Sequence, residues 1–166
     1  MNLKITRLSP EEWAAYRALR LEALQSEPQA FHSTFSEYAS RPSSYWRERL
    51  ADSAESKNSW LLFARGDNGA LLGMVGAVVE GTGADVISMY VTSEARGQGI
   101  GRALLTALLD ELKSRGVKKA TLQVNRIQEA AVRLYRRCGF SAVKEIEFCP
   151  GDGRRDNDYI MEKDLV

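Results

Sequence analysis

The chain has 166 residues, of which 44% are hydrophobic, so it is long enough and apolar enough to bury the core of one domain. Its 23 basic and 22 acidic side chains leave a formal net charge of +1, which excludes a global field that would recruit nucleic acid or an anionic membrane. The two cysteines favour a reduced, cytoplasmic protein, and neither a signal-peptide pattern at residues 1–5 nor a run long enough to span a membrane is present in the sequence.

The first third of the chain predicts one short strand and several helices. Residues 3–8 predict the strand. Ser9 can then cap a helix while Glu12 caps back, and Pro10 stands where a missing N–H does no harm. One face of this helix carries the apolar residues Trp13, Tyr16, Leu19, Ala23 and Leu24.

The segment after Pro28 predicts a short helix and loop over residues 29–41. Ser43 can cap a further helix, which carries Tyr45, Trp46 and Leu50.

The middle of the chain predicts an antiparallel meander of three strands. These strands are residues 60–64, 70–80 and 85–91. Asp67-Asn68-Gly69 is typical of the first hairpin turn, and Gly81-Thr82-Gly83 predicts the second.

The last third alternates helices and strands. The pattern predicts helices over 101–115 and 126–137, and strands over 119–124, 140–148 and 157–165. The fold class is therefore α/β (α+β), with a mostly antiparallel sheet that becomes locally parallel around the crossover helix. No linker or repeat divides the chain, so we expect a single domain over residues 1–166.

A glycine-rich junction separates the strand 85–91 from the helix 101–115. The first amides of a helix lack acceptors within the helix, and the helix dipole adds positive potential there, so an anion is a natural partner. Glycines at 97, 99 and 101 remove the Cβ atoms that would keep a ligand's oxygens from those amides. The junction therefore predicts a phosphate site.

Two familiar phosphate loops do not match this junction. A Walker loop ends in Gly-Lys-Ser/Thr, but Gly101 is followed by Arg102-Ala103. A dinucleotide fingerprint needs a glycine where Arg102 stands. A nucleotide-binding regulator is thereby disfavoured.

Two motifs resemble the signatures of the GCN5-related N-acetyltransferase (GNAT) superfamily. Arg-x-x-Gly-x-Gly at residues 96–101, after Met89-Tyr90-Val91, is similar to its coenzyme A loop. Residues 128–140, Gln-x-x-Ala-x-x-Leu-Tyr-x-x-x-Gly-Phe, are similar to its second signature. The resemblance covers residues 60–165 and implies an acyl-CoA N-acyltransferase fold, with a central twisted sheet splayed between the strands of Met89 and Val124.

The resemblance implies an N-acetyltransferase that uses acetyl-CoA. A primary amine of a small molecule or peptide would attack acetyl-CoA directly in a ternary complex, with Tyr135 placed to protonate the departing sulfur. The implied cofactor-binding residues are Met89, Tyr90, Val91, Arg96, Gly97, Gln98, Gly99, Ile100, Gly101, Arg102, Gln128, Ala131 and Tyr135. A core role for Tyr135 and solvated positions for Arg96 and Arg102 are the alternatives.

The general base is the least determined part of the site. Asp85 and Glu80, both near strand ends, are the catalytic candidates, and each is otherwise a solvated carboxylate. The branch of the superfamily that acetylates a ribosomal protein has a glutamate where Gln123 stands, and an amide cannot be that base. Gln128 replaces the usual asparagine of the second signature and could instead form a capping pair with Asn125.

The acceptor amine cannot be named from the residues. The single histidine, His32, and the charged turn at 152–156 would lie on the acceptor side in this superfamily, and both are otherwise solvent-exposed loop residues. We expect no metal, nucleic-acid or membrane partner, and a monomer or homodimer. A non-catalytic acyl-CoA-binding module remains the alternative function.

Overall fold

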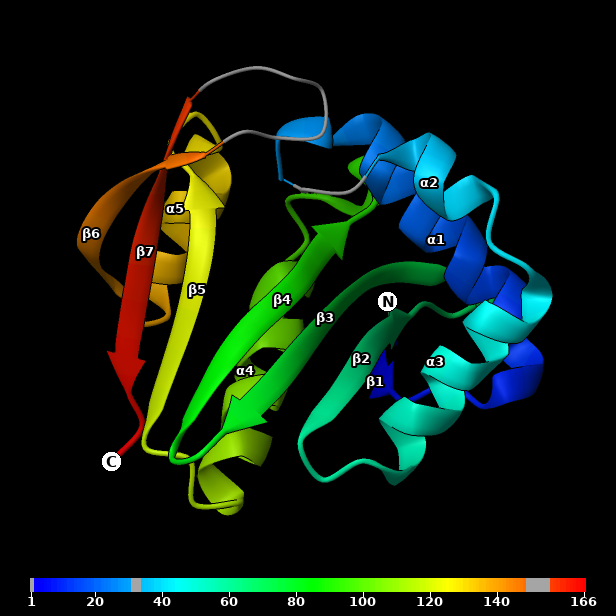
Figure 1. Cartoon of the computed structure of the whole chain (residues 1–166), viewed down its shortest axis with the longest axis horizontal. Helices are drawn as coiled ribbons and strands as arrows, with labels where there is room; N and C mark the ends of the chain where they lie inside the picture. The colour runs from blue at the N-terminus through cyan, green and yellow to red at the C-terminus, as the bar shows by residue number, and fades with distance from the viewer. Residues whose placement is uncertain (1, 31–33, 149–155) are drawn as a thin grey trace.

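A computed structural model describes residues 2–30, 34–148 and 156–166 of the chain (Figure 1). Its helices and strands follow the predicted order closely. In chain order they are β1 (Lys4–Thr6), a 3-10 turn (Pro10–Glu12), α1 (Trp13–Ser26), a second 3-10 turn (Pro28–Ala30), α2 (Phe35–Ala39), α3 (Ser43–Glu55), β2 (Ser59–Arg65), β3 (Leu71–Glu80), β4 (Gly83–Val91), a third 3-10 turn (Ser93–Ala95), α4 (Ile100–Ser114), β5 (Lys119–Asn125), α5 (Glu129–Arg137), β6 (Ser141–Phe148) and β7 (Asp156–Asp164).

The described strands form one seven-stranded sheet in the order β1-β2-β3-β4-β5-β7-β6. Neighbouring strands are antiparallel except β4 and β5, which are parallel and joined through α4. This confirms the mixed, mostly antiparallel sheet. The parallel pairing covers three positions, from Gly83 with Lys119 to Asp85 with Thr121, and beyond it the two strands diverge as predicted (Figure 1).

Helices cover both faces of the sheet, and strand alternation separates two cores. On β2, Leu62 and Ala64 join the apolar cluster of α4 and α5, whereas Leu61 and Phe63 join that of α1 and α3. The α4 side buries the leucines of that helix. The other side combines leucines with aromatic residues, and Trp46 of α3 is fully buried there.

Some local boundaries differ from the sequence expectation. The capping box at Ser9 forms, with its N–H bonded to Glu12 Oε2 at 3.1 Å, but the first turn is 3-10 and α1 begins at Trp13. Ser43 is the first residue of α3 rather than its cap, because Pro42 occupies the N-cap position. The first strand is also shorter than predicted.

Strand β4 contains a bulge that the sequence pattern did not reveal. Between Met74 and Gly76 of β3 the register shifts, because β4 advances three residues where β3 advances two. Ser88 lies at this point with φ 57°, a left-handed conformation that is strained for a residue other than glycine. The extra residue reverses the alternation, so that Val86 before it and Met89 after it both contact the α4 side of the core.

Candidate functional site

The divergence of β4 and β5 holds a cavity of about 520 Å³. Its walls come from β4, β5 and β7, from the start of α5, and from side chains of α1, α2 and α3. The segments with the two superfamily-like motifs therefore lie on one side of the cavity, and the N-terminal helices lie on the other.

Five of the predicted site residues line this cavity. They are Asp85, Met89, Gln128, Ala131 and Tyr135. The sequence placed these residues in two separate elements, the strand 85–91 and the helix 126–137, and the fold brings them to one space.

Glu80 is positioned differently from Asp85. Glu80 is exposed at the end of β3 and pairs with Gly83 next to the turn between β3 and β4. It does not line the cavity. Ala84 and Val86 contact the α4 side of the core, so Asp85 between them faces the side of α1 and α3. Of the two candidate carboxylates, Asp85 lines the cavity and Glu80 does not.

The edge of β4 that faces the cavity is available to a ligand. Pairing with β5 stops at Asp85, so the β5-facing backbone groups of residues 86–91 have no strand partner in the described sheet. Such an edge accepts an extended chain as an added strand. Met89 also lines the cavity. The hydroxyl of Tyr90 donates to Glu22 Oε1 at 3.1 Å on the other face, so Tyr90 has only its backbone to offer.

The loop before α4 has the open backbone that a phosphate requires. Gly97 and Gly99 have φ values of 77° and 81°, and a Cβ at either position would meet nothing within 4 Å. The first hydrogen bond of α4 runs from the Ala103 N–H to the Gly99 carbonyl at 3.0 Å. The amides before Ala103 therefore point out at the positive end of a 15-residue helix. Ile100 is buried, so its amide alone is available to a ligand.

Gly101 has a different role from the two glycines before it. A Cβ there would lie 3.0 Å from Leu134 Cδ2 and 3.7 Å from Val91 Cγ2. The sequence interpretation gave all three glycines a ligand-facing role, but Gly101 lets α4 approach α5 and β4 closely. Gln98 lies exposed in the same loop.

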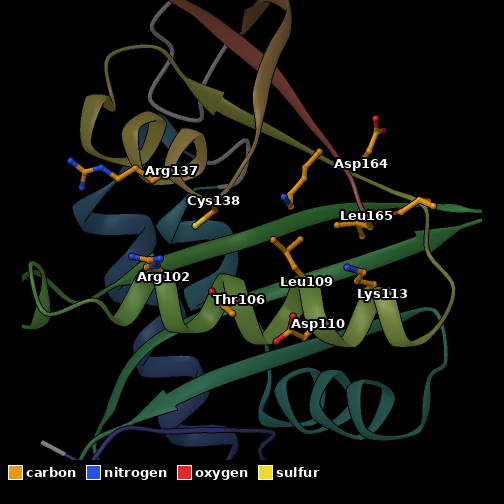
Figure 2. Close-up of a pocket in the computed structure, with 11 residues that line it drawn as sticks. Arg102, Thr106, Leu109, Asp110, Lys113, Arg137, Cys138, Asp164 and Leu165 are labelled. Carbon is orange, nitrogen blue, oxygen red and sulfur yellow. The ribbon is translucent and has the colours of Figure 1, made fainter.

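The two arginines of the first motif are also separated by the structure. Arg96 donates to the Val91 carbonyl at 3.0 Å and to Glu27 Oε1 at 2.8 Å, so it braces the loop against the end of α1. Arg102 lines a second hollow, of about 420 Å³, between α4, the end of α5 and β7. Figure 2 shows it in the first turn of α4, with Arg137 and Cys138 at the end of α5.

Tyr135 combines a core position with access to the cavity. It is 6% exposed, its ring lies 6.0 Å from that of Phe140 in an edge-to-face contact, and it lines the cavity. Burial raises the pKa of the Tyr135 phenol well above its ordinary value. The hydroxyl therefore stays protonated at neutral pH and can donate a hydrogen bond.

A buried polar cluster in the cavity wall was missed by the sequence analysis. Asp158 is 3% exposed and accepts from Gln123 Nε2 at 2.8 Å and from Asn125 Nδ2 at 3.0 Å. All three residues line the cavity. The available signal was an aspartate directly before the apolar run Tyr159-Ile160-Met161 of the final strand. The cluster fixes Gln123 as a donor to a carboxylate.

The predicted capping pair of Asn125 and Gln128 is not formed by side chains. Asn125 Oδ1 accepts the Ile127 N–H at 3.1 Å, and its carbonyl accepts the Gln128 N–H at 3.0 Å. This turn delays α5 to Glu129, three residues later than predicted. Gln128 takes the N-cap position without a side-chain cap bond, and it lines the cavity.

The N-terminal helices contribute cationic and aromatic side chains that the motifs did not point to. Arg20 of α1, Tyr38 of α2 and Arg49 of α3 line the cavity. His32 and residues 152–155, which we expected on this side, lie outside the described residues.

Within residues 2–30, 34–148 and 156–166, no group of three or more histidine, cysteine, aspartate or glutamate side chains is arranged to hold a metal ion. None of the helices described there combines the length and apolar character needed to cross a membrane.

Comparison with known proteins places this geometry in a family. The family model described as acetyltransferase (GNAT) family matches residues 16–140. The [ribosomal protein bS18]-alanine N-acetyltransferase of Escherichia coli K12 is 32% identical over 113 residues, covering 67% of this chain and 76% of that protein. The mycothiol acetyltransferase of Clavibacter michiganensis subsp. michiganensis is 32% identical over 139 residues, covering 84% of this chain and 42% of that protein.

Solved structures agree on the fold. The PaiA N-acetyltransferase of Thermoplasma acidophilum, in complex with coenzyme A, superposes with a TM-score of 0.78 at 20% identity, covering 99% of each chain. Together with the family model over residues 16–140, the open edge of β4 and the glycine loop before α4, this leads to one assignment. The chain belongs to the acetyltransferase (GNAT) family.

Proposed function

We propose that this protein transfers an acetyl group from acetyl-CoA to the primary amine of a small molecule or peptide by direct attack in a ternary complex. The observation that carries the proposal is that one cavity is lined by the open part of β4, by Tyr135 and by Asp85. Membership of the GNAT family supports the donor and the reaction class.

The residues present fit acetyl-CoA, which supplies the activated thioester. The loop amides before Ala103 would hold the pyrophosphate, because the positive φ and open surroundings of Gly97 and Gly99 leave them accessible. The unpaired backbone of residues 86–91 would hold the pantetheine arm. Ala131 and Gln128 form the neighbouring wall at the start of α5.

Two side chains would handle protons. An alkyl ammonium has a pKa of about 10.4 and does not attack while charged, so a base must accept its proton. We assign this role to Asp85, which lines the cavity on the side of α1 and α3. We assign Tyr135 the stabilisation of the departing sulfur, because a phenol kept protonated by burial can donate to a developing thiolate.

The names of the relatives suggest different amines and do not select one. The E. coli relative is named for an alanine of a ribosomal protein, and the Clavibacter relative for mycothiol. We propose one catalytic domain over residues 1–166, because every described strand belongs to one sheet. A cytoplasmic location, with Cys138 reduced, and a monomer or homodimer complete the proposal.

Calorimetric titration with acetyl-CoA, followed by thiol release against a panel of amines, tests the proposal. Binding together with amine-dependent thiol release supports the transferase. Binding without release from any amine would favour a non-catalytic acyl-CoA-binding module, and no binding of acetyl-CoA would overturn the assignment of the loop and the β4 edge.

A further inference from the structure

The side of the cavity formed by the N-terminal helices carries two arginines from different helices. Arg20 projects from α1 and Arg49 from α3, and both line the cavity. Resting on the function proposed above, we propose that the acceptor is an amine that also bears a carboxylate, as an α-amino acid does, and that Arg49 and Arg20 bind this carboxylate.

Arg49 of α3 has a buried donor that is not satisfied within the described residues. Its Nε is buried and has no hydrogen-bond partner among the described residues, and it forms no ion pair with any of them. Burial acts to lower the pKa of Arg49, but a hydrogen bond with Tyr16 and the neighbouring Tyr45 and Tyr38 hydroxyls raise it overall, so the group stays charged. The Arg49 side chain as a whole is half-buried, and its charge, together with the unsatisfied Nε, is stabilised when an anion meets the guanidinium group.

Arg20, on α1, contacts the ring of Tyr38. Its Cζ lies 5.2 Å from the centroid of the Tyr38 ring, and its Nη1 is buried. Tyr38 also lines the cavity, and it is one of the groups that raise the pKa of Arg49. A carboxylate matches the planar, forked donors of arginine better than any neutral group does.

The wall of the cavity that is formed by the strands carries negatively charged side chains. Asp85 of β4 and Asp158 of β7 line it. An ammonium group is attracted to these carboxylates, while a carboxylate on the same molecule is attracted to Arg20 and Arg49. The cavity therefore matches a zwitterion, whereas a polyamine would bring a second positive charge toward the two arginines.

Matched amines test the inference directly. L-Alanine, L-phenylalanine and L-lysine are each compared with the decarboxylated amine, ethylamine, 2-phenylethylamine and cadaverine, by acetyl-CoA-dependent thiol release. We expect kcat/KM for at least one amino acid to exceed that of its decarboxylated partner by roughly 10²-fold, the effect of a charge-assisted, bidentate pair. Binding of each member to the protein saturated with coenzyme A, measured by calorimetry, gives a readout that does not depend on turnover.

Variants assign the effect to Arg49. Arg49→Gln should remove most of the preference for the amino acid, mainly through KM, and Arg49→Lys should restore part of it. Arg47→Gln is the matched control, because Arg47 is exposed on the same helix, lies over the Trp13 ring at 5.6 Å and does not line the cavity. The control should keep both the rate and the preference.

The outcomes separate this inference from the function on which it rests. Equal use, or equal binding, of amino acids and their decarboxylated partners overturns the carboxylate site while acetyl transfer stands. A C-terminally amidated peptide accepted as well as the best amino acid also overturns it. Failure of the protein to bind acetyl-CoA overturns the proposed function and this inference together.

Discussion

Asp85 of β4 and Thr121 of β5 form the last pair before the two strands separate, and both residues line the cavity beyond. The end of the parallel pairing therefore places a carboxylate at the beginning of the open β4 edge. Three residues after Asp85, the bulge at Ser88 turns Met89 toward the α4 side. The same local geometry positions the carboxylate that we propose as the proton acceptor and exposes a backbone edge.

Asp85→Asn should lower kcat/KM by about 10²-fold at neutral pH with little change in acetyl-CoA affinity, because an amide cannot accept the proton of the amine. Glu80→Gln is the comparison, since Glu80 stands on the same hairpin but outside the cavity, and it should change the rate less than about twofold. Steady-state rates and calorimetry of both variants decide between the two carboxylates. A larger loss in Glu80→Gln would reverse the assignment.

Tyr135→Phe should reduce kcat by about 10- to 10²-fold and leave the dissociation constant of acetyl-CoA nearly unchanged, because it removes the hydrogen bond that we propose to the departing sulfur and keeps the packing with Phe140. Tyr159→Phe, at a half-buried tyrosine of β7, is the control. An unchanged kcat in Tyr135→Phe would remove this residue from the chemistry.

Gly99→Ala and Gly69→Ala form a matched pair for the loop. Both glycines have φ near 80° and open space around the Cβ position, so each variant should be destabilised by a similar amount, about 1–2 kcal/mol. Gly69 lies in the hairpin turn between β2 and β3, and only Gly99→Ala should also lose acetyl-CoA affinity. Denaturant unfolding and calorimetry measure the two effects separately. Equal affinity in the two variants would mean that the loop is not the phosphate site.

Gln123→Glu should make stability depend on pH. The new carboxyl would lie where Gln123 Nε2 now lies, 2.8 Å from Asp158 Oδ2, and two carboxylates so close raise a pKa in the folded state above its unfolded value of about 4. A carboxyl group whose pKa is higher in the folded state than in the unfolded state stabilises the fold at low pH. That contribution is lost as the pH rises and the group ionises.

The variant should therefore be near wild type at pH 4 and less stable by about 1–3 kcal/mol at pH 8, as measured by thermal unfolding across this range. Gln25→Glu, at an exposed position of α1, should show no such trend. A pH-independent loss in Gln123→Glu would mean that the cluster relaxes to separate the two carboxyl groups.

Much of the architecture followed from local signals in the sequence. Turn residues such as Asp67-Asn68-Gly69 and the apolar period of α4 specify their elements through backbone preference and burial, so order and strand direction were predictable. The glycine loop was equally readable, since a positive φ at Gly97 and Gly99 depends on the residue itself.

Tertiary structure decided what depends on the meeting of distant segments. The bulge at Ser88 arises from the register between β3 and β4, and the Asp158 cluster from the pairing of β5 with β7. The close approach of Gly101 to Leu134 depends on how α4 packs against α5. Arg20 and Arg49 belong to no motif, and they become candidates for binding because two helices place them beside one cavity. Local preferences along the chain were enough to specify the helices, the strands and the glycine loop before α4, whereas the proposed acceptor side depends on contacts between residues far apart in the chain, which no local pattern encodes.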